Sequence, residues 1–383
     1  IEENFRSYSK ALGSVPNLIC YSVKANSNLA VLNILARLGA GFDIVSKGEL
    51  QRVLKAGGDP GKIVFSGVGK TIEEMKAALN ENIYCFNVES KSELETLNKV
   101  ADGMEKIAPV AIRINPDISA STHPYIATGM RENKFGVPLD ESLDLYEFAQ
   151  NLANVSIEGI DCHIGSQLTE IDPIISSLKQ LIELVEELKN KQINLKHINL
   201  GGGLGVIYRN ETPPSILDYV NSILKELSHV DIKLILEPGR SIVANAGVLI
   251  TKVLYLKSTQ HKNFAIVDAA MNDLLRPCLY DAWLEILPTS KNSNSPPKTW
   301  DVVGPVCESG DFLGLQRNIA LEEHDTLAVL STGAYGFSMS SNYNSRCRAA
   351  ELIVDKDRVH LARRRESIDD LLLGETCMPN SDS

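Results

Sequence analysis

Short, continuous apolar runs alternate with longer segments of helical period between residue 18 and about residue 241. Strands of this kind, apolar on both faces, are typical of a parallel sheet covered by helices. The clearest helix is expected at 171–191, where isoleucine, leucine and valine recur at i, i+3, i+4 and i+7. We expect eight strands, at residues 18–25, 42–46, 63–67, 84–88, 110–116, 157–165, 197–203 and 233–239.

Eight strands with seven intervening helices predict an α/β fold of the (β/α)₈ barrel type. A doubly wound sheet usually has fewer strands and carries a GxGxxG motif after the first one, and no such motif follows residue 25. After about residue 247 the pattern changes to β-rich segments without regular helices. We therefore expect a barrel domain over residues 1–247 and a C-terminal, mostly antiparallel β-sandwich or barrel domain over residues 248–383. Short helices are expected at 270–283 and 366–374.

Composition excludes several classes of protein. With 383 residues and 44% apolar residues, the chain can bury a large core. The net charge of −11 argues against a nucleic-acid binder. No apolar run is long enough to span a membrane, and the first residues do not resemble a signal peptide, so we expect a soluble, cytoplasmic protein. The seven scattered cysteines lack a CxxC pair, which favours a reducing compartment and gives no sign of a metal site.

The candidate chemistry gathers where the predicted strands end, at the end of a barrel that carries active sites. The first strand ends in YSVKAN. Partial desolvation of Lys24 would lower its pKa and suit it to form a Schiff base, although lysines at strand ends are more often simply solvated. The seventh strand runs into GGGLG at 201–205, a backbone that could bind a phosphate or merely form a tight turn.

Four further motifs could take part. In EPGR, Glu237 could face a pyridine nitrogen and keep it protonated, or form a local ion pair with Arg240. In DCHIGSQ, the ring of His163 could stack on a planar cofactor and Ser166 could donate to a phosphate, whereas a lone histidine is more often structural. In GPVCESGD, Cys307 beside Glu308 could donate a proton. In GAYGF, Tyr335 could reach a phosphate. Cys307 and Tyr335 could equally be ordinary packing residues.

Taken together, these segments resemble the diaminopimelate decarboxylases. This family belongs to the alanine-racemase-like fold type of pyridoxal-phosphate enzymes, with the ornithine and arginine decarboxylases. The resemblance covers nearly the whole chain and keeps the order of the family motifs. The matching segments are YSVKAN, GAGFDIVSKGEL, IVFSGVGKT, FNVES, THPYIATGMRENKFG, IDCHIGSQL, GGGLG, ILEPGRSIVANAG, MNDLLRP, VVGPVCESGDFL and GAYGFSMSSNYNSR.

The resemblance implies a role for each candidate residue and pyridoxal 5'-phosphate as cofactor, with no metal. Lys24 would form the Schiff base, His163 would stack on the cofactor ring, and Glu237 would pair with the ring nitrogen. The residues implied around the phosphate are Ser166, Gly202, Gly203, Gly239, Arg240 and Tyr335. The residues implied to bind substrate are Arg240, Arg276, Tyr280, Glu308 and Tyr335.

The family pattern also implies the reaction and the assembly. Cys307 would protonate the α-carbon, meso-2,6-diaminopimelate would yield L-lysine and carbon dioxide in lysine biosynthesis, and a homodimer would share active sites because Cys307 and Glu308 come from the partner subunit. The sequence departs from the pattern at Asn199, where an acidic residue is common; we expect this change to be tolerated. Members usually carry a further N-terminal segment, so we expect a truncated form.

Three alternatives remain open from the sequence. One is a decarboxylase of the same fold that acts on ornithine, arginine, lysine or carboxynorspermidine. Arg276 favours instead a substrate with a second carboxylate, which ornithine lacks. Another is a non-catalytic, partner-binding homologue, which would have no physical need for Lys24, Cys307, Glu237 and His163 together. A racemase would need two opposed acid–base groups. The long segment 117–134 is expected to cover the pocket or to make a surface or dimer contact.

Overall fold

The computed structural model describes residues 1–118, 133–290 and 295–379. It divides into two compact units: residues 1–247 with 333–338, and residues 248–332 with 339–383. Most of the segment 117–134, expected to cover the pocket, lies outside the described residues. Within the described parts, no helix combines the length and the apolar character needed to cross a bilayer.

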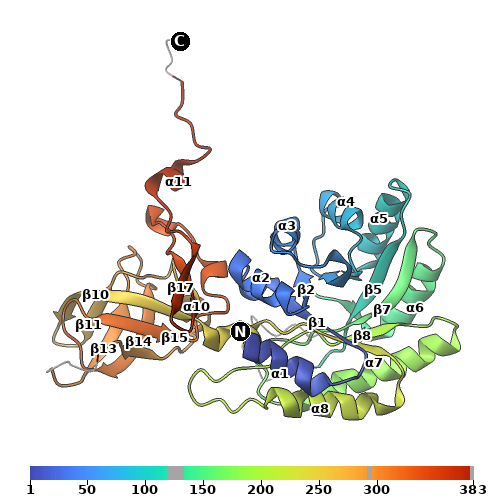
Figure 1. Cartoon of the computed structure of the whole chain (residues 1–383), viewed down its shortest axis with the longest axis horizontal. Helices are drawn as coiled ribbons and strands as arrows, with labels where there is room; N and C mark the ends of the chain where they lie inside the picture. Colours follow the sequence, from blue (N-terminus) through green and yellow to red (C-terminus); the bar gives the residue numbers. More distant parts are fainter. Residues whose placement is uncertain (119–132, 291–294, 380–383) are drawn as a thin grey trace. The chain divides into compact units, whose positions relative to one another are not determined.

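Unit 1 is a closed barrel of eight parallel strands, so the predicted (β/α)₈ fold is confirmed (Figure 1). Neighbouring strands pair in chain order, and β9 closes the ring against β1 through Asn17–Leu234 and the next two residue pairs. A ninth strand, β6 (Val137–Pro138), pairs only with β5. The barrel strands are β1 (Asn17–Ser22), β2 (Gly41–Ile44), β3 (Ile63–Phe65), β4 (Cys85–Val88), β5 (Ala108–Asn115), β7 (Val155–Asp161), β8 (His197–Asn199) and β9 (Lys233–Leu236).

Several strands end earlier than the apolar pattern predicts. After β1 the chain turns into a 3₁₀ helix, η1 (Val23–Ala25), and β8 stops at Asn199. Beyond β8 the backbone enters left-handed conformations, with φ of 62° at Gly201 and 110° at Gly203, which a strand ladder does not accommodate. Short turns therefore follow β1 and β8 directly, and Lys24, Gly202 and Gly203 lie in these turns.

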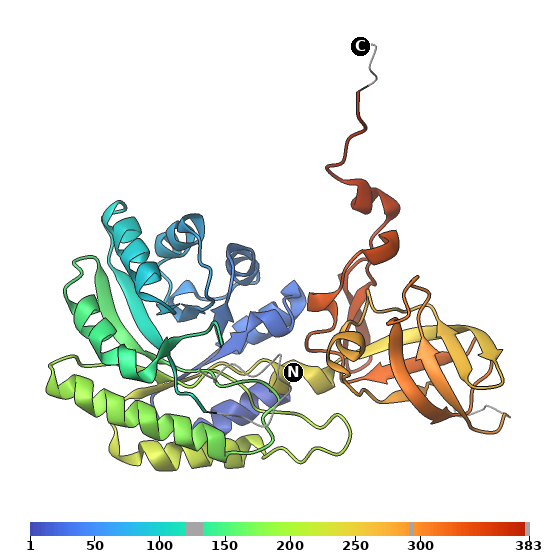
Figure 2. The ribbon, with the colours of Figure 1, turned by 180° about the vertical axis from the view of Figure 1, so that it is seen from behind.

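Helices form the outer layer of unit 1, as Figures 1 and 2 show for α7 and α8, which run side by side. Ser46, Thr71, Ser90 and Ser215 cap the N-termini of four of them by accepting backbone N–H groups. The predicted helix 171–191 is observed as α7. The helices are α1 (Glu2–Leu12), α2 (Leu29–Arg37), α3 (Lys47–Lys55), α4 (Ile72–Glu81), α5 (Lys91–Asp102), α6 (Leu139–Gln150), α7 (Asp172–Asn190), α8 (Ile216–Glu226) and α9 (Arg240–Val243), with 3₁₀ turns η2 (Pro60–Lys62), η4 (Leu227–His229) and η5 (Ala244–Ala246).

Unit 2 is mostly antiparallel β structure, as predicted. Six strands form one sheet in the order β12-β15-β10-β11-β13-β14, in which only β11 and β13 pair in parallel, and β16 and β17 form a separate hairpin. The strands are β10 (Val248–Ser258), β11 (Asn263–Val267), β12 (Ile286–Pro288), β13 (Lys298–Val303), β14 (Phe312–Ile319), β15 (Thr326–Leu330), β16 (Glu351–Asp355) and β17 (Arg358–Arg363).

The two helices of unit 2 are shorter than expected. α10 covers only Arg276–Tyr280, because Pro277 stands in its first turn and Asp281 adopts a left-handed conformation with φ of 49° directly after it. α11 (Ile368–Leu372) begins at a capping box formed by Ser367 and Asp370. Two 3₁₀ turns, η6 (Phe337–Met339) and η7 (Tyr343–Ser345), complete the regular structure.

Candidate active site

Lys24 lies in η1, directly after β1, and its amine meets a buried carboxylate. Nζ donates to Oδ2 of Asp43 at 2.8 Å, and the hydroxyl of Ser22 donates to the same oxygen at 2.7 Å. Asp43 comes from β2, where it is fully buried among apolar strand residues, while 40% of the Lys24 side chain is exposed. The amine is thus held at the rim of the barrel interior rather than in open solvent.

The expectation that desolvation lowers the pKa of Lys24 is wrong. Burial does act in that direction, but the Asp43 and Glu237 carboxylates more than offset it, so the pKa of Lys24 is raised above its ordinary value. The same ion pair outweighs burial at Asp43 and lowers the pKa of that carboxyl. Lys24 is consequently an ammonium group at neutral pH and must lose a proton before it can react with an aldehyde.

The glycine turn after β8 packs directly on the end of β9. Glu237 donates its backbone N–H to the carbonyl of Gly201 at 2.6 Å. A Cβ at Gly202 would collide with the backbone carbonyl of Glu237, and one at Gly203 would lie 2.6 Å from the carbonyl of Gly165. Glycine is required here because backbone meets backbone, and a turn so bare of side chains can expose amides to an anion.

His163 follows β7 and packs on this turn. Its Nδ1 accepts the N–H of Gly202 at 3.3 Å, which assigns the ring proton to Nε2. Burial lowers the pKa of His163 to about 3, and the positive charges of Arg113 and Lys24 act in the same direction. The imidazole is therefore neutral, flat and fixed in one tautomer, as a ring that stacks on an aromatic cofactor should be.

Glu237 directly follows β9 and is 6% exposed. Its Oε1 accepts from Nδ2 of Asn199 at 2.6 Å and from Nδ2 of Asn87 at 3.4 Å, whereas no described residue donates to Oε2. Burial raises the pKa of Glu237, and the nearby carboxylates of Asp43 and Asp161 add to that rise. A buried carboxylate with one unoccupied oxygen is a suitable acceptor for a protonated ring nitrogen.

Arg240, the first residue of α9, is a buried cation without a carboxylate partner among the described residues. Its guanidinium donates to Oγ of Ser166 at 3.0 and 3.2 Å and to the hydroxyl of Tyr208 at 2.7 Å. The ring of Tyr335 lies 4.9 Å from it. An uncompensated buried charge is costly, so this arrangement indicates a site for an anion. Ser166 was expected to donate to a phosphate; here it accepts from Arg240, which leaves its own proton available.

Two further residues complete this end of the barrel. Tyr335 adopts φ of 57°, uncommon for a side chain of its size, and its N–H donates to the carbonyl of Ala25 at 2.8 Å. Gly239 packs against η1, since a Cβ there would lie 2.9 Å from Cβ of Ser22 and 3.0 Å from that of Ala25. The segment 333–338 thus belongs to unit 1 through its contacts with η1.

The structure brings together all the predicted site residues of unit 1: Lys24, His163, Ser166, Gly202, Gly203, Glu237, Gly239, Arg240 and Tyr335. The other four belong to unit 2. Arg276 and Tyr280 lie on α10, where Arg276 is buried, and Cys307 and Glu308 are exposed in the turn before β14. The N–H of Cys307 donates to Oδ1 of Asn344 at 2.9 Å, which holds that turn in place.

Sequence reasoning missed Asp43, Asn87 and Tyr208. Asp43 and Asn87 interrupt otherwise apolar strands, FDI and CFNV, and a charged or amide side chain in a fully buried strand is a signal that could have marked them. Tyr208 lies in the loop after the glycine turn, and nothing in its local sequence distinguishes it. Its contact with Arg240 exists only in the folded barrel.

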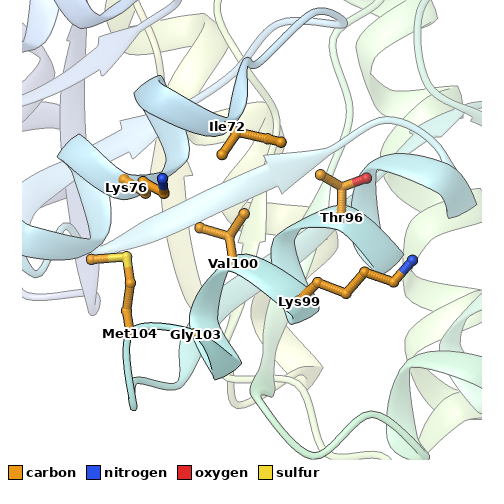
Figure 3. Close-up of a pocket in the computed structure, with 7 residues that line it drawn as sticks. All are labelled: Ile72, Lys76, Thr96, Lys99, Val100, Gly103 and Met104. Carbon is orange, nitrogen blue, oxygen red and sulfur yellow. The ribbon is translucent and has the colours of Figure 1, made fainter.

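A groove on the outer helical layer is unrelated to these residues. It has a volume of about 510 Å³ and lies between α4 and α5, where Figure 3 shows Ile72 and Val100 along it and Lys99 extending away from them. Of the two lysines that line it, Lys76 and Lys99, Lys76 already pairs with Glu73 at 3.2 Å. None of the predicted site residues lines this groove.

The residues gathered at the barrel end match the needs of one cofactor. Pyridoxal phosphate carries an aldehyde that reacts with an amine, a phosphate that needs an anion cradle, and a pyridine nitrogen that needs an acceptor. Lys24, the Arg240 and glycine-turn region, and Glu237 meet these needs at the end of the barrel where active sites form. Fold and site together define a pyridoxal-phosphate enzyme of the barrel type.

Comparisons with known proteins place the chain within that class. The family described as "Pyridoxal-dependent decarboxylase, pyridoxal binding domain" matches residues 1–244. The chain is 56% identical to the diaminopimelate decarboxylase of Pseudomonas aeruginosa over 379 residues, 99% of this chain and 91% of that one, and 56% identical to that of Vibrio cholerae over 380 residues, with the same coverage. The crystal structure of the Helicobacter pylori enzyme complexed with L-lysine superposes with a TM-score of 0.94 at 45% identity, covering 97% of this chain and 93% of that one. The chain belongs to the diaminopimelate decarboxylases, within the pyridoxal-dependent decarboxylases.

Proposed function

We propose that this chain removes one carboxylate of meso-2,6-diaminopimelate to give L-lysine and carbon dioxide. The observation that carries the proposal is the 56% identity to diaminopimelate decarboxylases over 99% of the chain, because it extends through both units and thus through every residue expected to touch cofactor or substrate. The L-lysine in the Helicobacter pylori structure is the product that this reaction would release.

In this proposal residues 1–247, together with Tyr335, would bind the cofactor, which, when bound, supplies the electron sink that allows a carboxylate to leave an α-carbon. Lys24 would hold it through the amine, once that amine has lost its proton. Glu237 would accept the ring N–H through Oε2, and the neutral ring of His163 would cover one face. Arg240, Ser166, the glycine turn and Tyr335 would hold the phosphate.

In the same proposal residues 248–383 would supply the substrate contacts other than that of Arg240. Arg276 on α10 would grip the carboxylate that is retained, with Tyr280 beside it, and Glu308 would bind the distant amine. The thiol of Cys307 would then deliver a proton to the α-carbon that has lost carbon dioxide. A substrate with one carboxylate, such as ornithine, would leave Arg276 without its anion.

A substrate comparison tests the reaction. The purified protein, loaded with cofactor, is incubated separately with meso-diaminopimelate, ornithine and arginine, and the released carbon dioxide is measured. We expect turnover of meso-diaminopimelate alone. Turnover of ornithine without turnover of meso-diaminopimelate would contradict the substrate and leave the fold and cofactor unaffected.

The role of Lys24 has a spectroscopic test. The variant Lys24→Ala should lose both turnover and the visible absorbance of the protein-bound cofactor, since it removes the amine that holds the aldehyde in this proposal. Lys179→Ala is the matched control, because Lys179 lies on the outer helix α7 with 59% of its side chain exposed. Lys24→Ala with an unchanged spectrum and full turnover would refute the assignment.

We further propose a homodimer in which Cys307 and Glu308 complete the site of the partner subunit, working in the cytoplasm, where the free thiol of Cys307 stays reduced. The exposed position of both residues is compatible with this arrangement. The hairpin of unit 2 also exposes apolar side chains, 57% of Leu352 and 65% of Leu361, as a subunit contact would require.

Subunit mixing tests the shared site. Lys24→Ala and Cys307→Ala homodimers are each impaired, but a mixed dimer carries one site with both native residues. Random reassortment of equal amounts should therefore restore about a quarter of the native activity. If activity does not rise above that of Cys307→Ala alone, although light scattering shows mixed dimers, the sites are not shared.

A further inference from the structure

Behind Glu237 lies an amide that the proposed reaction does not use. Asn199 is the last residue of β8 and is fully buried. Its Nδ2 donates to Oε1 of Glu237 at 2.6 Å, the shortest hydrogen bond that this carboxylate receives from the described residues. Asn87, the second donor, is more distant at 3.4 Å.

The orientation of the Asn199 amide is dictated by the backbone. Its Oδ1 accepts the N–H of Gly201 at 2.9 Å, and a backbone N–H can only donate. The oxygen must therefore face the glycine turn, and the nitrogen must face Glu237. The side chain of Asn199 thus connects the glycine turn to Glu237, the carboxylate proposed to accept the N–H of the cofactor ring.

We propose that Asn199 is a positioning residue for Glu237. The N–H group of Asn199 occupies Oε1 of Glu237, so that Oε2 is left to face the cofactor. Because an amide has no acidic proton to exchange, Glu237 does not share a proton at this contact. The inference rests on the proposed function, in which Glu237 accepts the ring N–H.

The charges around Glu237 explain why a neutral donor matters. Burial and the carboxylates of Asp43 and Asp161 raise the pKa of Glu237, while the charge of Lys24 and the hydrogen bond from Asn199 oppose that rise. Asp161 is itself buried and has a pKa raised to about 7. A further acid would add to a region already crowded with carboxylates. The titratable groups that face Glu237 are Lys24 of η1, Asp43 of β2, Asp161 of β7, Arg113 of β5 and Cys20 of β1.

An aspartate at position 199 would keep the shape and change the chemistry. It could still accept from Gly201, but it would place a second carboxyl group at hydrogen-bond distance from Oε1. Two carboxyl groups so close share one proton, and the pair titrates as a unit. The charge that Glu237 presents to the ring would then also depend on where the shared proton lies.

The experiment records the visible absorbance of the bound cofactor against pH, and its dissociation constant, for the native protein, Asn199→Asp and Asn199→Ala. We expect Asn199→Asp to show one more one-proton transition than the native protein, and Asn199→Ala to bind the cofactor about tenfold more weakly without that additional transition. Asn28→Asp is the matched control: Asn28 is a buried cap of α2 whose oxygen accepts from Ala30, a role that aspartate can also fill.

A double variant guards against loss of folding. In Asn199→Asp/Glu237→Gln the donor and the acceptor of the hydrogen bond are exchanged, so the thermal stability lost in Asn199→Asp should return. The native spectrum should not return, because the negative charge now lies at position 199. Identical pH titrations of Asn199→Asp and the native protein would overturn the inference, and so would a native spectrum in the double variant. Failure of the native protein to bind the cofactor at all would instead refute the proposed function.

Discussion

Two histidines show how position decides the role of a residue. Burial lowers the pKa of both His163 and His197 to about 3. His163 follows a strand end and contacts the glycine turn. His197 begins β8 at the opposite end of the barrel, with its ring 5.4 Å from that of Tyr84. A low pKa is thus common to a site residue and to a structural one.

His197 makes the protein sensitive to acid. Its folded-state pKa lies below the unfolded value of about 6.5, so the unfolded chain binds the extra proton more readily, and stability falls as the pH drops below 6.5. At pH 5 the cost is about 2 kcal/mol, from 1.36 kcal/mol per pH unit. We expect His197→Phe to remove this loss, as measured by urea unfolding at pH 7 and pH 5. Equal losses in variant and native protein would contradict the prediction.

The Lys24–Asp43 ion pair keeps the amine protonated, and we predict that this slows incorporation of the cofactor. Asp43→Asn removes the negative charge that raises the pKa of Lys24, so more of the amine is neutral at any given pH. Each unit of fall in the pKa increases that neutral fraction about tenfold. We expect stopped-flow absorbance to show a pH–rate curve for cofactor incorporation shifted to lower pH in the variant. Asp231→Asn, at an exposed loop position, should leave the curve in place, and a native curve for Asp43→Asn would refute the idea.

At the scale of elements, the glycine turn after β8 shows how much the sequence revealed. Three adjacent glycines predicted a bare backbone that binds a phosphate or forms a tight turn. The packing of this turn on the backbone of Glu237, which follows β9 and lies 35 residues after Gly202, could not be read from the local sequence. The strand lengths were overestimated for a related reason, since apolar periodicity continues into turns that are buried.

Substitution at Gly202 should damage this turn directly. An alanine Cβ would collide with the backbone carbonyl of Glu237, which cannot move without disturbing β9. We expect Gly202→Ala to lower the free energy of unfolding by about 1–3 kcal/mol and to weaken cofactor binding. Gly69→Ala is the control, because no atom lies within 4 Å of its added Cβ. Calorimetry and cofactor titration check both, and equal effects of the two variants would contradict the prediction.

At the scale of the whole molecule, the two units are interleaved in sequence. The segment 333–338 returns to unit 1 after most of unit 2 has been formed. Within unit 1 the N–H of Gly333 donates to the carbonyl of Ala244 at 3.0 Å, and Asn26 donates to the carbonyl of Gly333 at 3.1 Å. The candidate site is therefore built from both halves of the chain.

This interleaving predicts a weakness in the isolated barrel fragment. A protein of residues 1–247 lacks Tyr335 and its contact with Arg240, so we expect it to bind the cofactor at least about tenfold more weakly than the whole chain, even when circular dichroism shows it folded. Full-length Tyr335→Ala should show much of the same loss, whereas Tyr335→Phe, which keeps the ring contact with Arg240 and lacks only the hydroxyl, should show a smaller one. Native affinity in a folded fragment would contradict the prediction.

The sequence by itself determined the barrel, the β-rich second unit and most of the residues that gather at the barrel end, because apolar periodicity, glycine runs and motif order are properties of neighbouring residues. Only the tertiary structure decided which groups meet across strands. The ion pair of Lys24 with Asp43, the amide link from Asn199 to Glu237 and the contact of Tyr208 with Arg240 join positions distant in the chain. For that reason the pKa of Lys24 is raised, whereas the sequence led us to expect a lowered one. Desolvation could be inferred from one strand, but the Asp43 carboxylate that outweighs it lies on the next strand of the barrel.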